Sequence, residues 1–397
     1  MTGATTIADA GLQLLRITPK TVWAFLRLEA GNGRVGWGEA TLPSATDALR
    51  EAAGRLLPGL RGAPAAPVLV ERLQEADPPL PLAALASALD MALLDLEGQR
   101  QGLPIHALLG GAVRQAVPLY ANINRRTVER TPRAFGASAA AAGRVGYTIF
   151  KLAPFDEIDQ ARCAEGDIAK ALEPGLERIA ATRAAIGPEA ALRVDCHWRF
   201  DLRAAAVMID ACRDFGLDWI ECPVPETADA AEAIAGLRRR AARQGCRLAG
   251  LEMGTGPAAF QPFLEAGSYD VIMPDVKYLG GLARFRALAE SAARHGAIVS
   301  PHNPTGPVCH VASLHVAAVL PELDSLEVQF DETPLFADLV SGHVPAVTGG
   351  AAAPPRLPGL GVALDPALAA RLDLDRREPF PGAGRGRRAE ASHISPK

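Results

Sequence analysis

The chain has 397 residues, of which 49% are hydrophobic and 22% charged, and its formal net charge is −4. This composition is typical of a folded globular protein, and the length suits two domains or one large barrel with an attachment. The acidic balance and the lack of a long Lys/Arg run argue against nucleic-acid binding, and no apolar run reaches the roughly 18 residues of a membrane span. We therefore expect a protein that binds a small molecule, with no nucleic-acid or membrane partner.

The first 112 residues are predicted to form an α+β unit of their own. Apolar stretches at 12–15, 21–28 and 35–39, with a Gly-Asn-Gly turn at 31–33, indicate a short antiparallel meander. A helix is predicted over Ala83–Gln101, because apolar residues recur there at every third or fourth position.

From Val117 onward the pattern changes to strands alternating with helices, which is typical of parallel βα units. Eight such units in about 230 residues favour a closed (β/α)₈ barrel over an open sheet, and we assign it residues 113–345. Amphipathic helices are predicted at Leu202–Phe215, Ala230–Gln244, Leu282–His295 and Pro307–Leu320. The eight strands are predicted at Val117–Ile123, Thr148–Ala153, Leu192–Cys196, Trp219–Cys222, Arg247–Glu252, Val271–Pro274, Ile298–Pro301 and Leu326–Gln329.

Two further segments follow the barrel. Residues 346–375 contain a compact turn at Pro358–Val362 and are predicted to return to the first domain. Residues 376–397 are rich in Pro, Gly, Arg and Ser and are predicted to be disordered. The six cysteines contain no Cys-x-x-Cys pair, and we identify no signal peptide, so we expect reduced thiols in a cytoplasmic protein.

Polar residues collect at the predicted carboxyl ends of the strands, where a (β/α)₈ barrel carries its functional side chains. A single acid in such a place is often only a helix N-cap, but capping does not explain charged or imidazole groups at seven successive ends. In strand order, these residues are Asn122 and Asn124, Lys151, Asp195 and His197, Glu221, Glu252, Asp275 and Lys277, His302 and Asn303, and Glu327.

Three acids on consecutive strands, Asp195, Glu221 and Glu252, are predicted to converge at one side of the barrel mouth. Three carboxylates that close repel one another unless a cation holds them, and all-oxygen ligation favours Mg²⁺ over zinc. We therefore predict one magnesium ion per active site. His197 lies two residues after Asp195 on the same predicted strand, so we expect the two side chains to face the same way.

Across the mouth, Asp275 and His302 are predicted to lie on adjacent strands. A carboxylate beside an imidazole fixes its tautomer and raises its basicity, as a general base requires. A magnesium ion on one side and this dyad on the other suit removal of the proton α to a carboxylate. Lys151 as a cation, and Glu327 if it is protonated, are placed to donate hydrogen bonds to the substrate carboxylate.

Short motifs at these strand ends are similar to those of a known family. They are Phe150-Lys151-Leu152, Val194-Asp195, Trp219-Ile220-Glu221-Cys222-Pro223, Gly250-Leu251-Glu252, Met273-Pro274-Asp275 with Gly280-Gly281, and Ser300-Pro301-His302-Asn303. The similarity begins at Gly36-Trp37-Gly38-Glu39 and ends at Pro358-Gly359-Leu360-Gly361. The chain resembles the mandelate racemase subgroup of the enolase superfamily over nearly its whole length. The resemblance implies a capping domain over a modified barrel, Mg²⁺ on the three acids, His302 paired with Asp275 as base, and a homo-oligomer.

One departure from the racemase pattern changes the expected reaction. That subgroup usually has Lys-x-Lys on the second strand, but this chain has Lys151-Leu152-Ala153, and Ala153 cannot carry a proton. The chain has His197 instead, and Asp-x-His on the third strand resembles the sugar-acid dehydratases of the D-galactonate and D-mannonate type. The resemblance implies that a 2,3-dihydroxy acid binds Mg²⁺, that His302 removes the C2 proton and that His197 protonates the departing 3-hydroxyl, which gives a 2-keto-3-deoxy acid.

Two alternatives stay open. An epimerase, racemase or cycloisomerase would use His197 or Lys277 as the second proton carrier, and a non-catalytic ligand-binding protein would keep only the fold. In each enzyme case the partner is a small-molecule carboxylate, aldonic or aldaric in the dehydratase. The residues predicted to contact it are Asn122, Asn303, Lys277 and Arg199.

Overall fold

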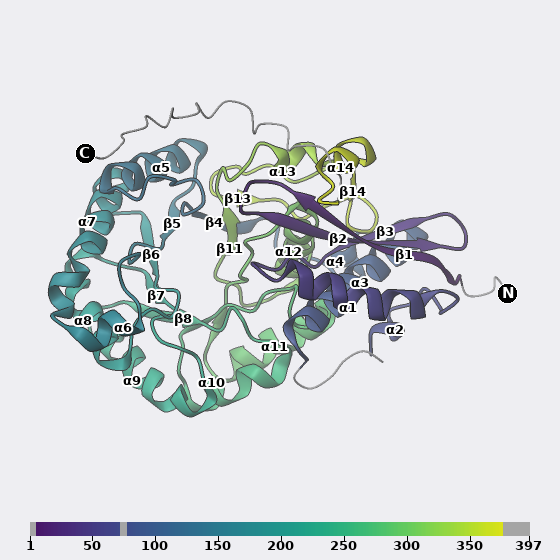
Figure 1. The fold of residues 1–397 in the computed structure, drawn as a ribbon. Coiled ribbons are helices and arrows are strands. Elements are labelled where there is room, and N and C mark those ends of the chain that lie inside the picture. The colour runs from purple at the N-terminus through teal and green to yellow at the C-terminus, as the bar shows by residue number, and fades with distance from the viewer. Residues whose placement is uncertain (1–4, 72–77, 376–397) are drawn as a thin grey trace, which may run out of the picture.

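The computed structural model describes residues 5–71 and 78–375, and the predicted disordered tail at 376–397 lies outside them. The described chain consists of a cap, drawn in purple at the right of Figure 1, and a barrel, drawn in blue to green. No helix in these two ranges is both long enough and apolar enough to cross a membrane.

The cap is built from an antiparallel meander and the long helix α3. Its strands β1 (Ile7–Arg16), β2 (Val22–Ala30) and β3 (Val35–Glu39) pair in that order, as predicted. Because successive strand residues face opposite sides, Trp23 and Phe25 of β2 join the barrel core, whereas Leu26 joins a core within the cap. The cap helices are α1 (Thr46–Leu56), α2 (Val68–Glu71), α3 (Leu80–Gln101) and α4 (Ile105–Leu108).

The eight predicted barrel strands are all present and parallel, in the order β10-β9-β8-β7-β6-β5-β4-β11. Most end one or two residues before the predicted end, because the chain leaves the ladder there to form turns. β10 and β11 form no ladder, but Asp324 N–H donates to Val299 O (2.9 Å) and Ser300 Oγ donates to Ser325 O (2.6 Å) across this seam. The strands are β4 (Val117–Asn122), β5 (Ile149–Leu152), β6 (Ala191–Asp195), β7 (Trp219–Glu221), β8 (Arg247–Gly250), β9 (Val271–Ile272), β10 (Ile298–Val299) and β11 (Leu326–Gln329).

Helices cover the outside of this sheet, as the ring around β5 to β8 in Figure 1 shows. The eighth unit has only the four-residue α13 (Leu335–Asp338), so the barrel is a modified (β/α)₈ barrel. The others are α5 (Pro132–Val145), α6 (Gln160–Glu165), α7 (Ile168–Ile186), α8 (Leu202–Ala211), α9 (Ala231–Ala242), α10 (Gln261–Ala266), α11 (Leu282–Arg294) and α12 (Pro307–Val319).

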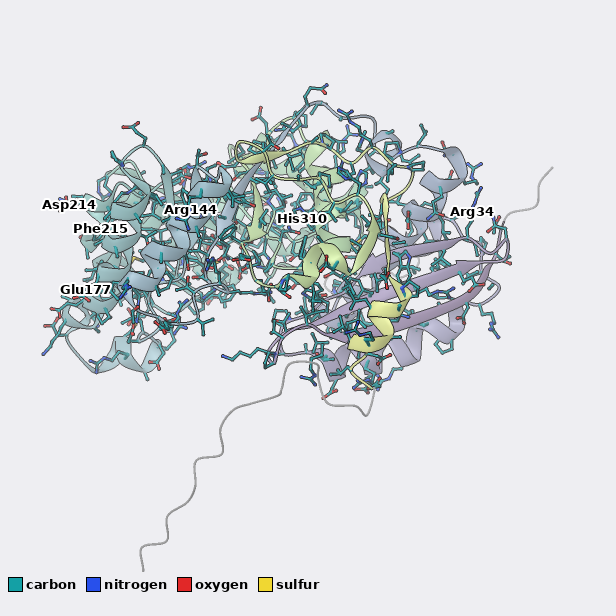
Figure 2. All side chains as sticks on the ribbon, turned by 90° about the horizontal axis from the view of Figure 1, so that it is seen from above. Arg34, Arg144, Glu177, Asp214, Phe215 and His310 are labelled. Carbon is teal, nitrogen blue, oxygen red and sulfur yellow. The ribbon has the colours of Figure 1, made fainter. Side chains whose placement is uncertain are left out.

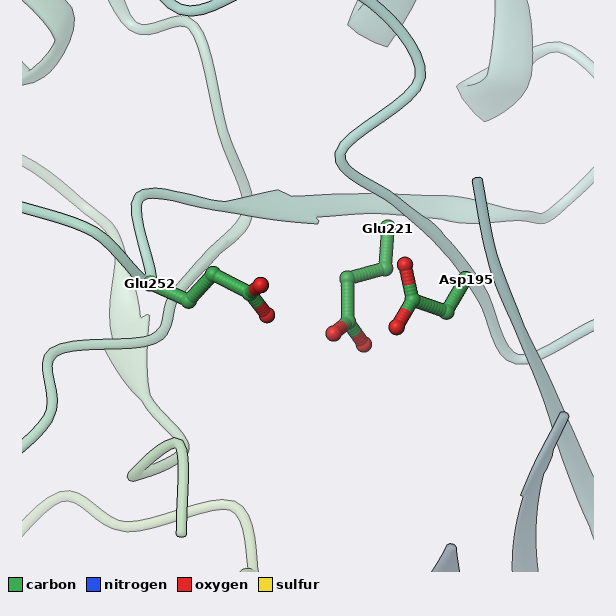
Figure 3. A group of neighbouring side chains, drawn as sticks. All are labelled: Asp195, Glu221 and Glu252. Atoms are coloured by element: carbon green, nitrogen blue, oxygen red, sulfur yellow. The ribbon is translucent and has the colours of Figure 1, made fainter. Parts of the chain in front are cut away.

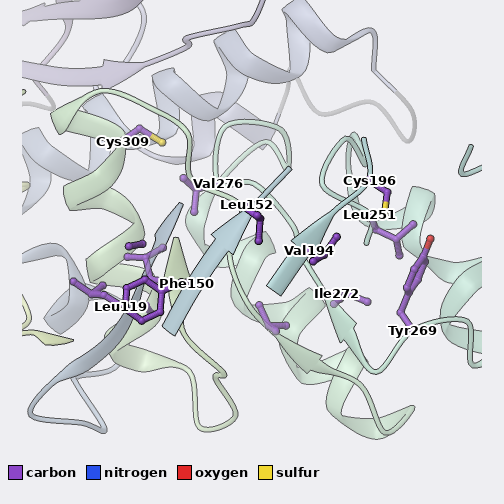
Figure 4. Packing of buried hydrophobic residues seen from close by; sticks show 14 of the residues in the cluster. Leu119, Phe150, Leu152, Val194, Cys196, Leu251, Tyr269, Ile272, Val276 and Cys309 are labelled. Carbon is purple, nitrogen blue, oxygen red and sulfur yellow. The ribbon is translucent and has the colours of Figure 1, made fainter. Parts of the chain in front are cut away.

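Alternation along the barrel strands separates two layers of packing. Side chains such as Leu119, Phe150 and Val194 face the helices and form one large cluster with them (Figure 4). On the inner face, Tyr120 and Trp219 pack with Met273, and the buried Arg193 guanidinium lies 3.5 Å from the centre of the Trp219 ring. The amino-terminal half of the barrel is therefore a filled core, and chemistry is confined to the other end.

The C-terminal segment contacts both domains and so completes the cap. Strand β13 (Ala351–Ala352) pairs with β4 of the barrel, while β14 (Val362–Leu364) pairs with β12 (Val340–Gly342). After α14 (Pro366–Leu372), Leu374 N–H donates to Leu14 O in β1. The predicted fold class, a modified barrel with a cap completed by this segment, is confirmed.

The cap and the barrel meet at buried polar groups as well as apolar ones. Figure 2 shows His310, on α12, near the middle of the molecule, between the helices that carry Glu177 and Asp214 and the end of the cap near Arg34. From α3, Asp90 accepts the Leu282 N–H (2.8 Å) at the start of α11. A carboxylate at a helix N-terminus is favoured by the helix dipole. Even so, burial raises the pKa of Asp90 to about 6.

Asp90→Asn is expected to change the pH dependence of stability. Because the folded pKa of about 6 exceeds the unfolded value of about 3.9, the contribution of Asp90 is full below about pH 4 and is lost as the pH rises through 6. The amide keeps an oxygen for Leu282 but does not titrate. The difference in the free energy of unfolding between the variant and wild type should therefore shift by about 1–3 kcal/mol in favour of the variant when the pH is raised from 4.5 to 7. Urea unfolding midpoints at pH 4.5 and pH 7 test this, with the exposed Asp47→Asn as control. If the midpoints of Asp90→Asn and wild type differ by the same amount at both pH values, the prediction is contradicted.

Candidate active site

Three acids meet at the carboxyl end of the barrel. Asp195 is the last residue of β6, Glu221 is the last of β7, and Glu252 lies two residues after β8. Each offers an oxygen within 4.8 Å of the oxygens of the other two, and all three side chains are buried (Figure 3). The parallel register that pairs Asp195 with Glu221 brings these groups together.

The charges of these acids are poorly balanced by the protein alone. Burial raises the pKa of Glu221 to about 7 despite the nearby Lys151 ammonium, and burial with the charge of Asp195 raises the pKa of Glu252 well above its usual value. Carboxylates that resist ionisation because they crowd one another are the donors that a hard divalent cation stabilises. The three acids therefore fit a metal ion with oxygen ligands.

Lys151 lies among these acids and is itself buried. Its Nζ is 2.6 Å from Glu221 Oε1, 3.1 Å from Glu327 Oε1 and 3.8 Å from Asp195 Oδ2. Burial alone would lower the pKa of this ammonium, but the acids raise it well above its usual value. Lys151 is therefore a permanent cation at the site.

Glu327, on β11, is held as a carboxylate. Asn122 Nδ2 donates to its Oε1 (2.7 Å) and Asn303 N–H donates to its Oε2 (3.0 Å). Burial raises the pKa of Glu327, but Lys151, His302 and these donors lower it to about 2. The donors and the cation around Glu327 thus favour its ionised form, and donation of a hydrogen bond from a protonated Glu327 to the substrate stays a prediction.

The predicted dyad is formed by residues just beyond β9 and β10. His302 Nδ1 lies 2.8 Å from Asp275 Oδ2, and its Nε2 lies 3.4 Å from Glu252 Oε2, on the side of the three acids. Lys277 Nζ contacts the same Asp275 oxygen at 2.7 Å and is 1% exposed. Asp275 thus orients the imidazole with Nε2 toward the three acids, and the Lys277 ammonium is paired with Asp275.

His197 reaches Asp195, but not by strand alternation. The strand ends at Asp195, and both His197 and Trp198 have positive φ angles, 47° and 56°. In this left-handed turn the His197 N–H donates to Asp195 Oδ1 (2.9 Å), and the ring Nε2 lies 2.9 Å from Asp195 Oδ2. The side chain is 43% exposed. The predicted pleated arrangement is therefore corrected to a turn that leaves His197 accessible beside the acids.

The residues predicted to contact substrate have protein partners in the structure. Asn122 and Asn303 both hold Glu327, and Asn303 Oδ1 also accepts the Ser313 hydroxyl (2.9 Å). Arg199 donates to the carbonyl oxygens of Asp156 (3.2 Å) and Ile158 (2.8 Å), in the loop after β5. Substrate contact by these residues stays a prediction, whereas their support of the site is seen directly.

Glu39, at the end of β3 in the cap, was not among the predicted site residues. It is fully buried and accepts hydrogen bonds from Thr305 Oγ1 (2.7 Å), Gly306 N–H (2.7 Å) and Cys309 N–H (2.9 Å). These donors belong to the start of α12, which follows the loop that carries His302. An acid next to an apolar strand was the only signal in the sequence, since Thr305 is 266 residues away.

Comparison with known proteins places these features in a family. A family model described as the mandelate racemase/muconate lactonizing enzyme N-terminal domain matches residues 12–110, and one described as enolase C-terminal domain-like matches residues 134–368. The chain is 31% identical over 372 residues to a D-galactonate dehydratase of Ralstonia nicotianae, which covers 90% of this chain and 92% of that protein. It is 30% identical over 298 residues to a D-gluconate dehydratase of Thermoproteus tenax, with 75% of this chain and 57% of that protein covered.

A solved structure agrees with these matches. The crystal structure of a mandelate racemase/muconate lactonizing enzyme from a Sulfitobacter species has a TM-score of 0.81 to this chain at 25% identity, with 96% of this chain and 97% of that chain covered. The resemblance inferred from the strand-end motifs is confirmed. The chain belongs to the mandelate racemase/muconate lactonizing enzyme family of the enolase superfamily.

Proposed function

We propose that this enzyme is a Mg²⁺-dependent hydro-lyase that converts an aldonic or aldaric acid into a 2-keto-3-deoxy acid. The observation that carries the proposal is the presence of two histidines beside one acid cluster, with His302 buried against Asp275 and His197 accessible next to Asp195. The names of the galactonate and gluconate dehydratase relatives support the same class of substrate and reaction. A homo-oligomeric state and a cytoplasmic location stay predictions from the sequence.

His302 is placed to act as the base. Asp275 accepts the Nδ1 proton, which leaves the Nε2 lone pair directed toward the acid cluster, where it would take the C2 proton. When bound to Asp195, Glu221 and Glu252, Mg²⁺ would stabilise the negative charge that develops on the substrate carboxylate. Lys151 would donate a hydrogen bond to the same carboxylate.

His197 is placed to act as the acid. Its imidazole is held by Asp195 yet 43% exposed, so it can face a substrate bound at the mouth. Asp195 raises the pKa of His197, which keeps a proton available for the departing 3-hydroxyl. The proton taken from C2 and the proton given to the leaving hydroxyl are thus handled by different groups, and the enol that results tautomerises to the keto acid.

The alternative reactions have less support. A racemase needs a second base on the opposite face of the substrate, and Ala153, which follows β5, has no group that transfers a proton, so His197 would have to serve as that base. A cycloisomerase that uses Lys277 would need a free amine, whereas the Lys277 ammonium is buried against Asp275, which raises its pKa further. Elimination requires neither group.

Replacing each histidine should separate the two proton transfers. With aldonic and aldaric acids and Mg²⁺ in D₂O, wild type should form a 2-keto-3-deoxy acid. His302→Asn should lose both C2 exchange and elimination, by about 10²–10⁴-fold. His197→Asn should lose elimination by a similar factor but retain exchange, because the base is intact. NMR of C2 and a colour assay for keto acids measure the two steps.

The exposed His343→Asn is the matched control for these variants and should behave as wild type. Full elimination by His197→Asn would contradict the role of His197 as the acid. Inversion at C2 without any keto acid in wild type would contradict the proposed reaction.

Glu252→Gln should uncouple stability from magnesium. Removing one of three crowded carboxylates relieves repulsion, so the metal-free variant should melt at a higher temperature than metal-free wild type. Wild type should gain stability as MgCl₂ is added, whereas the variant should gain little because a ligand is missing. Thermal melts with EDTA and with increasing MgCl₂ test this, and Glu265→Gln on the exposed side of α10 is the control. An unchanged response to MgCl₂ in Glu252→Gln would contradict the assignment.

A further inference from the structure

One carboxylate outside the groups assigned above connects three of the turns that carry them. Glu226 lies five residues after Glu221, at the end of β7. Its Oε2 accepts the indole N–H of Trp198 (2.9 Å), and its Oε1 accepts the backbone N–H of Leu251 (2.7 Å) and the hydroxyl of Tyr269 (2.7 Å). The thiol of Cys222 lies 3.8 Å from Oε1. Trp198, Cys222 and Leu251 thus lie in the turns after β6, β7 and β8, whereas Tyr269 lies just before β9.

Three of these four donors, Trp198, Cys222 and Leu251, have unfavourable backbone conformations. Among the described residues, six that are not glycine have positive φ, and four of them are His197, Trp198, Cys222 and Leu251. Side chains with a Cβ rarely adopt this region, and such conformations persist only where surrounding contacts hold them. Three of the four donate to Glu226, and the fourth, His197, precedes Trp198 directly. The strained residues of these turns are therefore held by hydrogen bonds to one carboxylate, that of Glu226.

The neighbouring backbone leaves room for this carboxylate. A Cβ at Gly250 would lie 2.3 Å from Glu226 Oε1 and 2.6 Å from Tyr269 Cζ, which is too close for either contact to persist. Gly250 is followed by Leu251 and then by Glu252. The absence of a side chain at Gly250 thus lets Glu226 reach the turn that presents Glu252.

We propose that Glu226 is a positioning residue, which fixes His197 beside the acid cluster by holding the indole of Trp198 and tying the turn after β6 to the turn after β8. His197 lies between Asp195, at the end of the strand, and Trp198, whose backbone N–H donates to Cys222 O (2.7 Å) and whose indole donates to Glu226. Because both His197 and Trp198 have positive φ, release of the indole allows the turn to relax and carries the imidazole away. This inference rests on the proposed function, in which His197 is the acid.

Glu226→Gln and Trp198→Phe test the contact from both sides. The glutamine amide can keep its oxygen toward Leu251 and Tyr269, but its NH₂ then faces the indole N–H, so the Trp198 contact is lost selectively. Trp198→Phe removes only the indole donor, and Tyr269→Phe removes a different donor to the same carboxylate. We expect Glu226→Gln and Trp198→Phe each to slow elimination about tenfold or more, while the rate of C2 exchange stays within about threefold of wild type. Tyr269→Phe should change neither the rate of elimination nor the rate of exchange.

A second measurement does not depend on turnover. The chain has four tryptophans, so ¹⁵N-labelled protein gives four indole N–H signals, one of which disappears in Trp198→Phe. That signal should move upfield in Glu226→Gln, because it loses a charged acceptor. An unmoved signal would overturn the proposal.

The kinetic outcomes separate this proposal from the proposed function. If wild type eliminates and Glu226→Gln loses exchange and elimination equally, or loses neither, the positioning role is overturned and the dehydratase assignment stands. If wild type forms no keto acid from any of the aldonic and aldaric acids, the proposed function is overturned. The proposed role of Glu226 in positioning His197 as a proton donor is then overturned as well.

Discussion

The active end of the barrel is organised by an excess of buried negative charge. Asp195, Glu221, Glu252 and Glu327 lie around a single ammonium, that of Lys151, where water cannot screen them. Asn122 and Asn303 stabilise Glu327, and His197 and Lys151 lower the pKa of Asp195 despite its burial. The imbalance therefore falls on Glu221 and Glu252, whose pKa values are raised. Like charges held close together destabilise the fold, and a bound cation or substrate offsets this repulsion. The turns with positive φ angles after β6, β7 and β8 directly adjoin Asp195, Glu221 and Glu252.

A second set of buried acids joins the cap to the barrel. Glu39 and Asp90 accept backbone N–H groups at the start of α12 and at the start of α11. The first N–H groups of a helix have no partner within the helix, so these two acids satisfy donors that would otherwise be buried without one. Asp95 accepts the N–H of Leu360 and so holds the C-terminal segment against α3. The loops after β9 and β10, which carry the dyad, therefore run between the barrel and fixed points in the cap.

Hydrophobic patterning and strand order were enough to predict the eight barrel strands, the cap meander and the meeting of the three acids. Contacts that depend on turns were not predictable. Alternation failed at His197 because the strand ends at Asp195, and a strand-end position did not show that Asn122 and Asn303 would hold Glu327. No role was predicted for Glu39 because its partners are far away in sequence. A hydrophobic repeat of two residues in a strand, or of three to four in a helix, shows which face a side chain occupies. It does not show which distant residue will be the hydrogen-bond partner, because that depends on the tertiary structure.

No ladder joins β10 to β11, and so the seam of the barrel lies between His302 and Glu327. Beyond this seam, the loop after β10 is held by Glu39 of the cap through Thr305, Gly306 and Cys309. A barrel separated from its cap would keep its seven ladders but lose these restraints on the loop that carries His302. Exchange of caps between relatives is therefore constrained: a foreign cap without an acid at this position would leave the contacts across the seam in place but would no longer hold the loop after β10.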